Sequence, residues 1–183
     1  MTDSSVNIVI GGEAGQGLVT IGLVLAKGLV RRGYSIVVTQ GYQSRIRGGH
    51  NTFAIRAGVG EILAPKEAVD LLICLDAQTA ALHKPELSTG GLMVVDSREG
   101  DGTPGIRVPF KELASLKFAN TVALGVAGAL IGLPEETLGE ALEDFFGHKD
   151  PSLLEENRRA LKTAYQWTDG QSPLFPKLPS PLV

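Results

Sequence analysis

The sequence has very little of the residue type that redox clusters and structural metal sites need most. Cys74 is the only cysteine among the 183 residues, so no disulfide can form within the chain. One thiol also cannot supply the several thiolates that an iron–sulfur cluster or a structural zinc site requires. Any iron–sulfur cluster that works with this protein must therefore lie on another chain.

The sequence also lacks a strong excess of charge of one sign and any long hydrophobic run. Its 17 basic residues are outnumbered by 20 acidic residues, which gives no electrostatic case for binding a polyanion such as nucleic acid. The amino-terminal segment carries an acid where a signal peptide carries positive charge, and no apolar run approaches the ~18 residues of a membrane span. We therefore expect a cytoplasmic protein that binds neither nucleic acid nor a membrane.

Short apolar runs without alternation are present instead, and such runs are typical of strands buried on both faces of a parallel sheet. These runs cover residues 6–11, 35–40, 70–76 and 91–97. Apolar residues at helical spacing connect the first two runs between Leu18 and Arg32, and Gly33 is the expected stop of that helix. Residues 51–58 alternate and follow the second run too closely for a helical crossover, so they are expected to form an antiparallel strand at a sheet edge.

Further helices are predicted over residues 76–84, 110–116 and 119–133, from Pro134 onward, and over 151–167. Together with the strands they predict one α/β, Rossmann-like domain over residues 1–170. Its sheet is mainly parallel, with helices on both faces and one antiparallel strand. Residues 171–183 are rich in proline and are expected to form an extended tail, either an arm for a partner or a linker from a longer chain.

A glycine-rich segment, GGEAGQG, follows the first apolar run and precedes a helix pattern. Such a loop at the carboxyl end of a parallel strand points backbone N–H groups at the positive end of a helix dipole, which favours an anion. The candidate ligands are Gly12, Gly15, Gln16 and Gly17. Their glycine spacing reverses the dinucleotide fingerprint, so the alternative is that the glycines only form a tight turn.

A second polar segment, residues 41–51, follows the second apolar run and is expected at the same edge of the sheet. Arg45 and Arg47 have the chemistry to contact a phosphate. The other candidates there are Ser44 and Asn51, which donate neutral hydrogen bonds, and Gly48 and Gly49, which allow close backbone approach. The alternative is a surface loop whose arginines pair with acids of another subunit.

Three further groups of residues are assigned structural roles. His50, His83 and His148 stand too far apart for a helical ligand pair, so they are not expected to bind a metal. Asp76 and Asp96 end predicted strands and are expected to cap the helices that follow, with acceptance of a ligand hydroxyl as the alternative. Cys74 is expected to be a buried thiol, and the GDG at 100–102 is interpreted as a turn.

The order of these motifs resembles the gamma subunit of the 2-oxoacid:ferredoxin oxidoreductases. GGEAGQG, then the run Ser44-Arg45-Ile46-Arg47-Gly48-Gly49, then a strand containing Arg56 carry the resemblance, which extends from about Asn7 to Leu161. It implies a subunit that is inactive alone and assembles with alpha, beta and delta subunits. It also implies that the complex uses thiamine diphosphate, Mg²⁺, iron–sulfur clusters and coenzyme A, and passes electrons to ferredoxin.

The resemblance suggests that this chain contributes to coenzyme A binding, because the glycine loop, Arg45 and Arg47 offer donors that suit phosphates. The same residues could instead contact the thiamine-binding subunits. The resemblance makes 2-oxoglutarate one expected substrate, with pyruvate and branched 2-oxoacids as others. The remaining alternatives are a freestanding NADP-type nucleotide-binding module, for which Thr39, Gln40 and Gly41 replace the usual acid, and a purely structural subunit.

Overall fold

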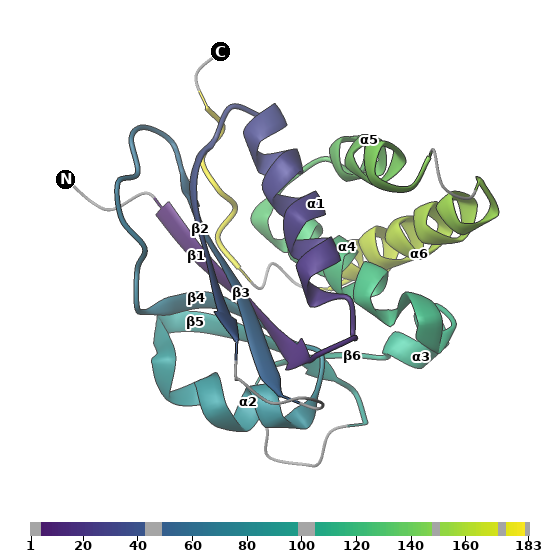
Figure 1. Ribbon diagram of the computed structural model, residues 1–183, viewed down its shortest axis with the longest axis horizontal. Helices are drawn as coiled ribbons and strands as arrows, with labels where there is room; N and C mark the ends of the chain where they lie inside the picture. Colours follow the sequence, from purple (N-terminus) through teal and green to yellow (C-terminus); the bar gives the residue numbers. More distant parts are fainter. Residues whose placement is uncertain (1–4, 43–48, 99–104, 148–150, 172–174, 182–183) are drawn as a thin grey trace.

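Six strands form one mixed sheet in the computed structural model, which describes residues 5–42, 49–98, 105–147, 151–171 and 175–181 (Figure 1). The strands are β1 (Ser5–Glu13), β2 (Ser35–Tyr42), β3 (His50–Gly58), β4 (Val69–Cys74), β5 (Leu87–Asp96) and β6 (Ile106–Val108). The helices are α1 (Leu18–Arg31), α2 (Ala77–His83), α3 (Phe110–Leu113), α4 (Ala119–Ile131), α5 (Glu135–Phe146) and α6 (Pro151–Asp169). Two short 3-10 turns, η1 (Lys84–Glu86) and η2 (Leu116–Phe118), follow α2 and α3. The prediction of an α/β domain is confirmed.

The strand order is β2-β3-β1-β4-β5-β6. From β1 to β6 the neighbours are parallel, whereas β3 runs antiparallel to both β1 and β2. The antiparallel direction of residues 51–58 is therefore confirmed, but their expected place at the sheet edge is wrong. The short connection from β2 lets β3 pair back between β2 and β1, and β2 becomes the edge strand.

The prediction that the apolar run at 35–40 is buried on both faces is also wrong. Residues Val38 to Tyr42 of β2 are exposed, with Val38 at 37% and Tyr42 at 64%. In the described part of the chain β2 has a strand neighbour on one side only, and its sequence SIVVTQGY carries no charged residue. Its β-branched residues thus reflect strand propensity rather than burial.

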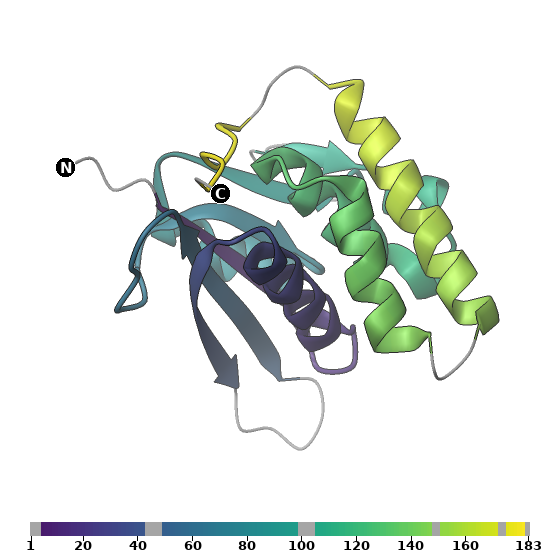
Figure 2. The same cartoon turned by 90° about the horizontal axis from the view of Figure 1, so that it is seen from above.

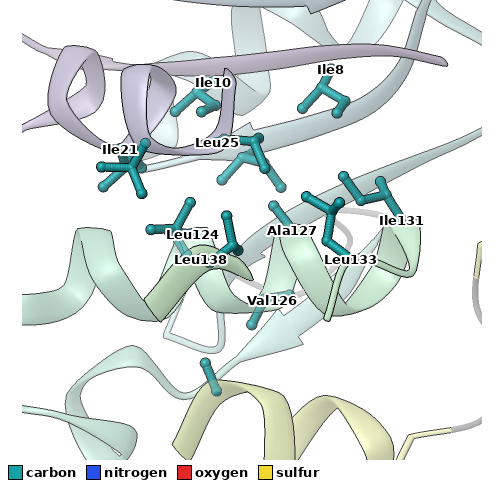
Figure 3. Close-up of a cluster of buried hydrophobic side chains, with 14 of the residues drawn as sticks. Ile8, Ile10, Ile21, Leu25, Leu124, Val126, Ala127, Ile131, Leu133 and Leu138 are labelled. Atoms are coloured by element: carbon teal, nitrogen blue, oxygen red, sulfur yellow. The ribbon is translucent and has the colours of Figure 1, made fainter. Parts of the chain in front are cut away.

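One face of the sheet carries most of the helices. Ile8 and Ile10 of β1 pack toward Leu25 of α1 and Leu124 of α4, as Figure 3 shows. Val126 lies on the opposite side of α4, toward α6 (Figure 3). Because it has packed neighbours on both sides, α4 is buried around nearly its whole circumference, which explains why its sequence is apolar and small rather than amphipathic.

Helix α2 lies on the other face of the sheet. Ala80 of α2 joins a smaller buried cluster with Val9, Leu72, Cys74 and Met93. Asp76 caps α2, because its carboxylate accepts a hydrogen bond from the Thr79 N–H at 2.8 Å. The expected cap and the burial of Cys74 are both confirmed, and helices cover both faces, although unequally.

The carboxyl-terminal segment returns to the domain. Leu178 is buried, and its N–H donates to the Ile131 carbonyl at 3.0 Å, so residues 175–181 pack near the end of α4 (Figure 2). Those residues contain neither helix nor strand. The described tail therefore docks on its own chain, and the boundary between residues 170 and 171 stays a prediction.

Other differences from the sequence prediction are small. The helix expected over 110–116 is only four residues long and continues as η2, and β6 was not predicted. Gly33 ends α1 with a φ of +82°, and Pro134 precedes α5 with Glu135 and Glu136 in the first turn, as expected.

Candidate functional site

The glycine loop connects β1 to α1 at the carboxyl end of β1. Gly15 and Gly17 have φ values of +97° and +78°, a region that residues with a Cβ seldom adopt. Gly17 is also the residue that precedes α1, and no side chain caps the helix. Since the first turn of α1 contains no acidic residue, the positive end of its dipole is not neutralised from within the helix.

Gln16 takes part in the loop itself. Its side-chain Oε1 accepts a hydrogen bond from the Glu13 N–H at 2.8 Å, and its Nε2 lies 3.5 Å from the Leu75 carbonyl. A Cβ on Gly12 would come within 2.4 Å of that Oε1 and 3.0 Å of the Leu75 Cβ, so a larger residue at position 12 would displace the Gln16 side chain from this hydrogen bond. Gln16 therefore shapes the loop more than it offers an amide to a ligand.

A cavity of about 500 Å³ opens beside this loop. Its walls come from the glycine loop, the carboxyl ends of β4 and β5, and the segment from α3 to the start of α4. The lining residues are Gly15, Gln16, Gly17, Leu75, Asp96, Arg98, Phe110, Leu116, Lys117, Ala119 and Asn120. This position, outside the carboxyl ends of parallel strands, is where open α/β sheets bind ligands.

The charges at the cavity come from Asp96, Arg98 and Lys117. The Arg98 N–H and Nε each donate to Asp96 Oδ1 at 2.9 Å, and the two side chains form an ion pair. Burial raises the pKa of Asp96, but the hydrogen bonds from Arg98 outweigh it, and the pKa falls below its ordinary value. Asp96 is thus an ionised partner of Arg98 rather than a helix cap, and Lys117 supplies an additional positive charge.

Asn120 brings an amide to the same wall. Its Nδ2 would lie 2.3 Å from a Cβ on Gly17, which means that the first turn of α4 touches the glycine loop directly. Its Oδ1 accepts from the Thr121 N–H at 2.9 Å. The glycine at position 17 therefore serves both the backbone turn and the close approach of α4.

Within the described residues, the start of β3 lies beside the glycine loop, and the expectation that both loops face one crevice stays a prediction. His50 pairs with Glu13 in the β1–β3 register, and the Ala14 N–H donates to the Gly49 carbonyl at 3.2 Å. Asn51 lies opposite Gly12. Ser44, Arg45, Arg47 and Gly48, as well as the GDG at 100–102, lie outside the described residues.

The structure divides the predicted site residues into two groups. Gly15, Gln16 and Gly17 line the cavity, whereas Gly49 and Asn51 lie on the β3 side of the loop and do not. Sequence reasoning missed Arg98, Lys117 and Asn120. Arg98 follows a parallel strand closely enough to have been proposed, but no local signal places Lys117 and Asn120 at the loop.

The structure also brings together two histidines that the sequence separates by 33 positions. The Nε2 atoms of His50 and His83 lie 2.8 Å apart, and His83 Nδ1 lies 2.7 Å from Glu86 Oε2. Within the described ranges, no group of three or more His, Cys, Asp or Glu residues is placed to hold a metal ion. In the same residues no helix is both long and apolar enough to cross a membrane.

Comparisons of the sequence with known proteins agree with this architecture. The family described as pyruvate ferredoxin/flavodoxin oxidoreductase matches residues 7–167. A relative from Archaeoglobus fulgidus, 2-oxoglutarate synthase subunit KorC, is 30% identical over 97% of this chain and 95% of its own length. The ketoisovalerate oxidoreductase subunit VorA of Methanothermobacter thermautotrophicus is 28% identical over 88% of this chain, which spans only 36% of VorA.

Solved structures share the fold. A 2-oxoglutarate:ferredoxin oxidoreductase from Magnetococcus marinus, with 2-oxoglutarate, coenzyme A and succinyl-CoA bound, superposes with a TM-score of 0.89 at 24% identity. The match covers 97% of this chain and 33% of that one. The gamma subunit of a keto/oxoacid ferredoxin oxidoreductase from Geobacter sulfurreducens superposes with a TM-score of 0.73 at 24% identity, over 91% of this chain and 99% of that one.

Proposed function

Because the chain belongs to the pyruvate ferredoxin/flavodoxin oxidoreductase family, we propose that it is the gamma subunit of a multisubunit 2-oxoacid:ferredoxin oxidoreductase. The observation that carries this proposal is the match to KorC over 97% of this chain and 95% of the relative, since KorC is named as a subunit of 2-oxoglutarate synthase. The resemblance found in the sequence motifs is thereby confirmed at the level of the family. The matches favour a subunit over a freestanding NADP-type module.

The proposed reaction is the oxidative decarboxylation of a 2-oxoacid to an acyl-CoA in the cytoplasm, with electrons passed to ferredoxin. Thiamine diphosphate, when bound on companion subunits, supplies the carbanion chemistry. With one buried cysteine, this chain does not have the donors for an iron–sulfur cluster, so the clusters also belong to companion alpha, beta or delta subunits. 2-Oxoglutarate is the first substrate to test, because KorC is named as a subunit of 2-oxoglutarate synthase and the Magnetococcus marinus enzyme has 2-oxoglutarate bound.

For this chain we propose a contribution to coenzyme A binding. Coenzyme A carries a pyrophosphate and a further phosphate, and the glycine loop presents the uncapped amino-terminal end of α1 beside Lys117 and Arg98. A cavity of about 500 Å³ is within the range of sites that hold a cofactor fragment. The remaining candidates, Arg45 and Arg47, would add phosphate contacts from the neighbouring loop.

Assembly is tested by purifying the tagged chain from its native cells and identifying the chains that accompany it. The expected result is a complex that contains cysteine-rich and thiamine-binding subunits and reduces ferredoxin with a 2-oxoacid and coenzyme A. Recovery of this chain alone, together with tight stoichiometric NADP binding measured by calorimetry, would refute the subunit proposal.

The coenzyme A contribution is tested separately on the assembled enzyme. Lys117→Ala removes an exposed charge near the loop and should raise the KM for coenzyme A about fivefold, with the KM for the 2-oxoacid unchanged. Arg45→Ala combined with Arg47→Ala should raise it about tenfold. Lys162→Ala, an exposed lysine of α6 outside the cavity, is the matched control.

The outcomes of the two tests are distinguishable. If every variant keeps the wild-type KM for coenzyme A in an active complex, the coenzyme A role is wrong and the subunit role stands. If the arginine variants fail to assemble, those arginines contact companion subunits instead.

A further inference from the structure

His50 and His83 form the buried part of a short hydrogen-bonded chain of titratable groups. His50, the first residue of β3, is only 5% exposed, and its ring lies 5.0 Å from that of His83 between centroids. The Nε2 atoms are 2.8 Å apart, and His83 Nδ1 is 2.7 Å from Glu86 Oε2. Glu86 is exposed, so this series of hydrogen bonds leads from solvent to the buried His50 imidazole.

The geometry of the hydrogen-bonded series His50–His83–Glu86 limits the number of protons that it can hold. An ionised carboxylate only accepts hydrogen bonds, so His83 Nδ1–H donates to Glu86. In the neutral pair, His83 Nε2 is then bare and accepts from His50 Nε2–H. A proton added to His83 reverses this central bond and moves the remaining hydrogen of His50 to Nδ1.

A second added proton cannot be accommodated in the same arrangement. Both facing nitrogens would then carry a hydrogen at 2.8 Å, and two imidazolium charges would repel each other. No hydrogen bond at His50 Nδ1 compensates for this repulsion, since that atom is buried and has no partner among the residues that the structure describes. The pair must therefore separate when both rings are protonated.

We propose that the His50–His83 pair is a pH-sensitive catch that fastens the start of β3 to the end of α2 and opens when both imidazoles carry a proton. The proposal does not depend on the coenzyme A role of the glycine loop. It does concern that loop, because His50 faces Glu13 in the β1–β3 register and its neighbour Gly49 accepts the Ala14 N–H. Opening of the catch is expected to loosen the loop from β3.

The charges around His50 set the direction of the effect. Burial and the neighbouring His83 lower the pKa of His50 below its ordinary value of 6.5, and Asp76 and Glu86 oppose them only in part. Glu13 of β1 is the remaining acid opposite His50. Because the closed state holds fewer protons than the open state, its stability is complete above about pH 6.5 and is lost as the pH falls through the lowered pKa.

The test is amide hydrogen exchange on the full chain between pH 7 and pH 5, with rates corrected for the intrinsic pH dependence. The protection of the Ala14 amide should fall as the pH decreases, by up to tenfold per pH unit for each proton taken up. The Val126 amide in the buried α4 reports global opening and should keep its protection. Equal losses at both amides, or no loss at Ala14, would overturn the proposal.

Variants distinguish the effect of the His50–His83 contact from the effect of burying His50 alone. In His83→Gln the amide oxygen can accept from a protonated His50, so the pH-dependent loss of Ala14 protection should become smaller, and only the part caused by burial of His50 should remain. Glu61→Gln, an exposed acid elsewhere, should keep the wild-type profile. If the Ala14 amide of His83→Gln loses as much protection at low pH as it does in the wild type, the proposal is contradicted.

A second readout needs no variant. In ¹⁵N NMR titrations of the wild-type protein, the His50 imidazole should titrate below its ordinary pKa of 6.5 and should lose its contact with His83 at low pH. Titration of His50 at the ordinary value, or a contact with His83 that persists at low pH, would also overturn the proposal.

Discussion

The contact between α4 and α6 provides a sharp test of how closely this domain is packed. Gly125 of α4 lies against α6, where an added Cβ would stand 2.6 Å from the Ala164 Cβ and 3.0 Å from the Leu161 carbonyl oxygen. Ordinary carbon–carbon contacts are ~3.5–4.0 Å, so Gly125→Ala requires the two helices to move apart or repack. Gly139 of α5 is also inside a helix, but an added Cβ there meets nothing within 4 Å.

The same substitution at the two positions should change stability in opposite directions. Alanine gains about 0.5–1 kcal/mol over glycine inside a helix at either site. At position 125 this gain is outweighed by overpacking, which typically costs about 1–3 kcal/mol. Since the propensity gain cancels in the comparison, the difference between the two variants measures the overpacking directly and should be about 1–3 kcal/mol in favour of Gly139→Ala.

The assay is urea unfolding of the full chain followed by circular dichroism, with the free energy of unfolding compared at equal m-values. We expect Gly139→Ala to be more stable than the wild type and Gly125→Ala to be less stable. If the two variants are stabilised equally, α4 and α6 are not as close in solution as the structure places them, and the reasoning fails.

Two further predictions concern polar groups inside the domain, the half-buried Asp70 and the buried Thr121. Asp70 accepts from Ser88 Oγ at 2.7 Å, the Asn7 N–H at 2.8 Å and Lys66 Nζ at 2.9 Å. Burial opposes ionisation, but these donors lower the pKa of Asp70 below 3.8. The contribution of Asp70 to the free energy of unfolding is therefore present above that pH and is lost as the pH falls through the lowered pKa. Asp70→Asn should therefore cost about 2 kcal/mol at pH 7 and flatten the loss of stability below pH 4 in urea titrations; an unchanged acid limb contradicts this. Thr121→Val removes the 2.5 Å hydrogen bond to buried Asn157 and should cost about 1–3 kcal/mol. Thr163→Val removes a solvent-exposed hydrogen bond from a half-buried residue and should change stability by less than about 0.5 kcal/mol; equal effects would show that the buried bond contributes nothing.

Features that depend on a few consecutive residues were predictable from the sequence. Gly33 ends α1 in a left-handed conformation and Asp76 caps α2, because both roles follow from the chemistry of one residue and its immediate neighbours. The glycine loop was placed correctly at the carboxyl end of β1 for the same reason.

Features that depend on long-range pairing were not predictable in this way. The alternation of residues 51–58 indicates a strand but does not tell which strands it pairs with, so the position of β3 between β2 and β1 was missed. The exposure of β2 follows from that error. Asn120 reaches the cavity because the first turn of α4 packs against the glycine loop, and Lys117 comes from η2 just before it. The His50–His83 contact requires the end of α2 to lie beside the start of β3.

The outer edge of β2, which has no strand neighbour in the part of the chain that the structure describes, bears on how the chain behaves when it is made without companions. An uncharged edge strand offers its backbone donors and acceptors to any extended peptide, including the same strand of another copy. Overproduction of this subunit by itself should therefore favour strand-to-strand aggregation. Substituting lysine at the exposed Thr39 should keep the preparation dispersed.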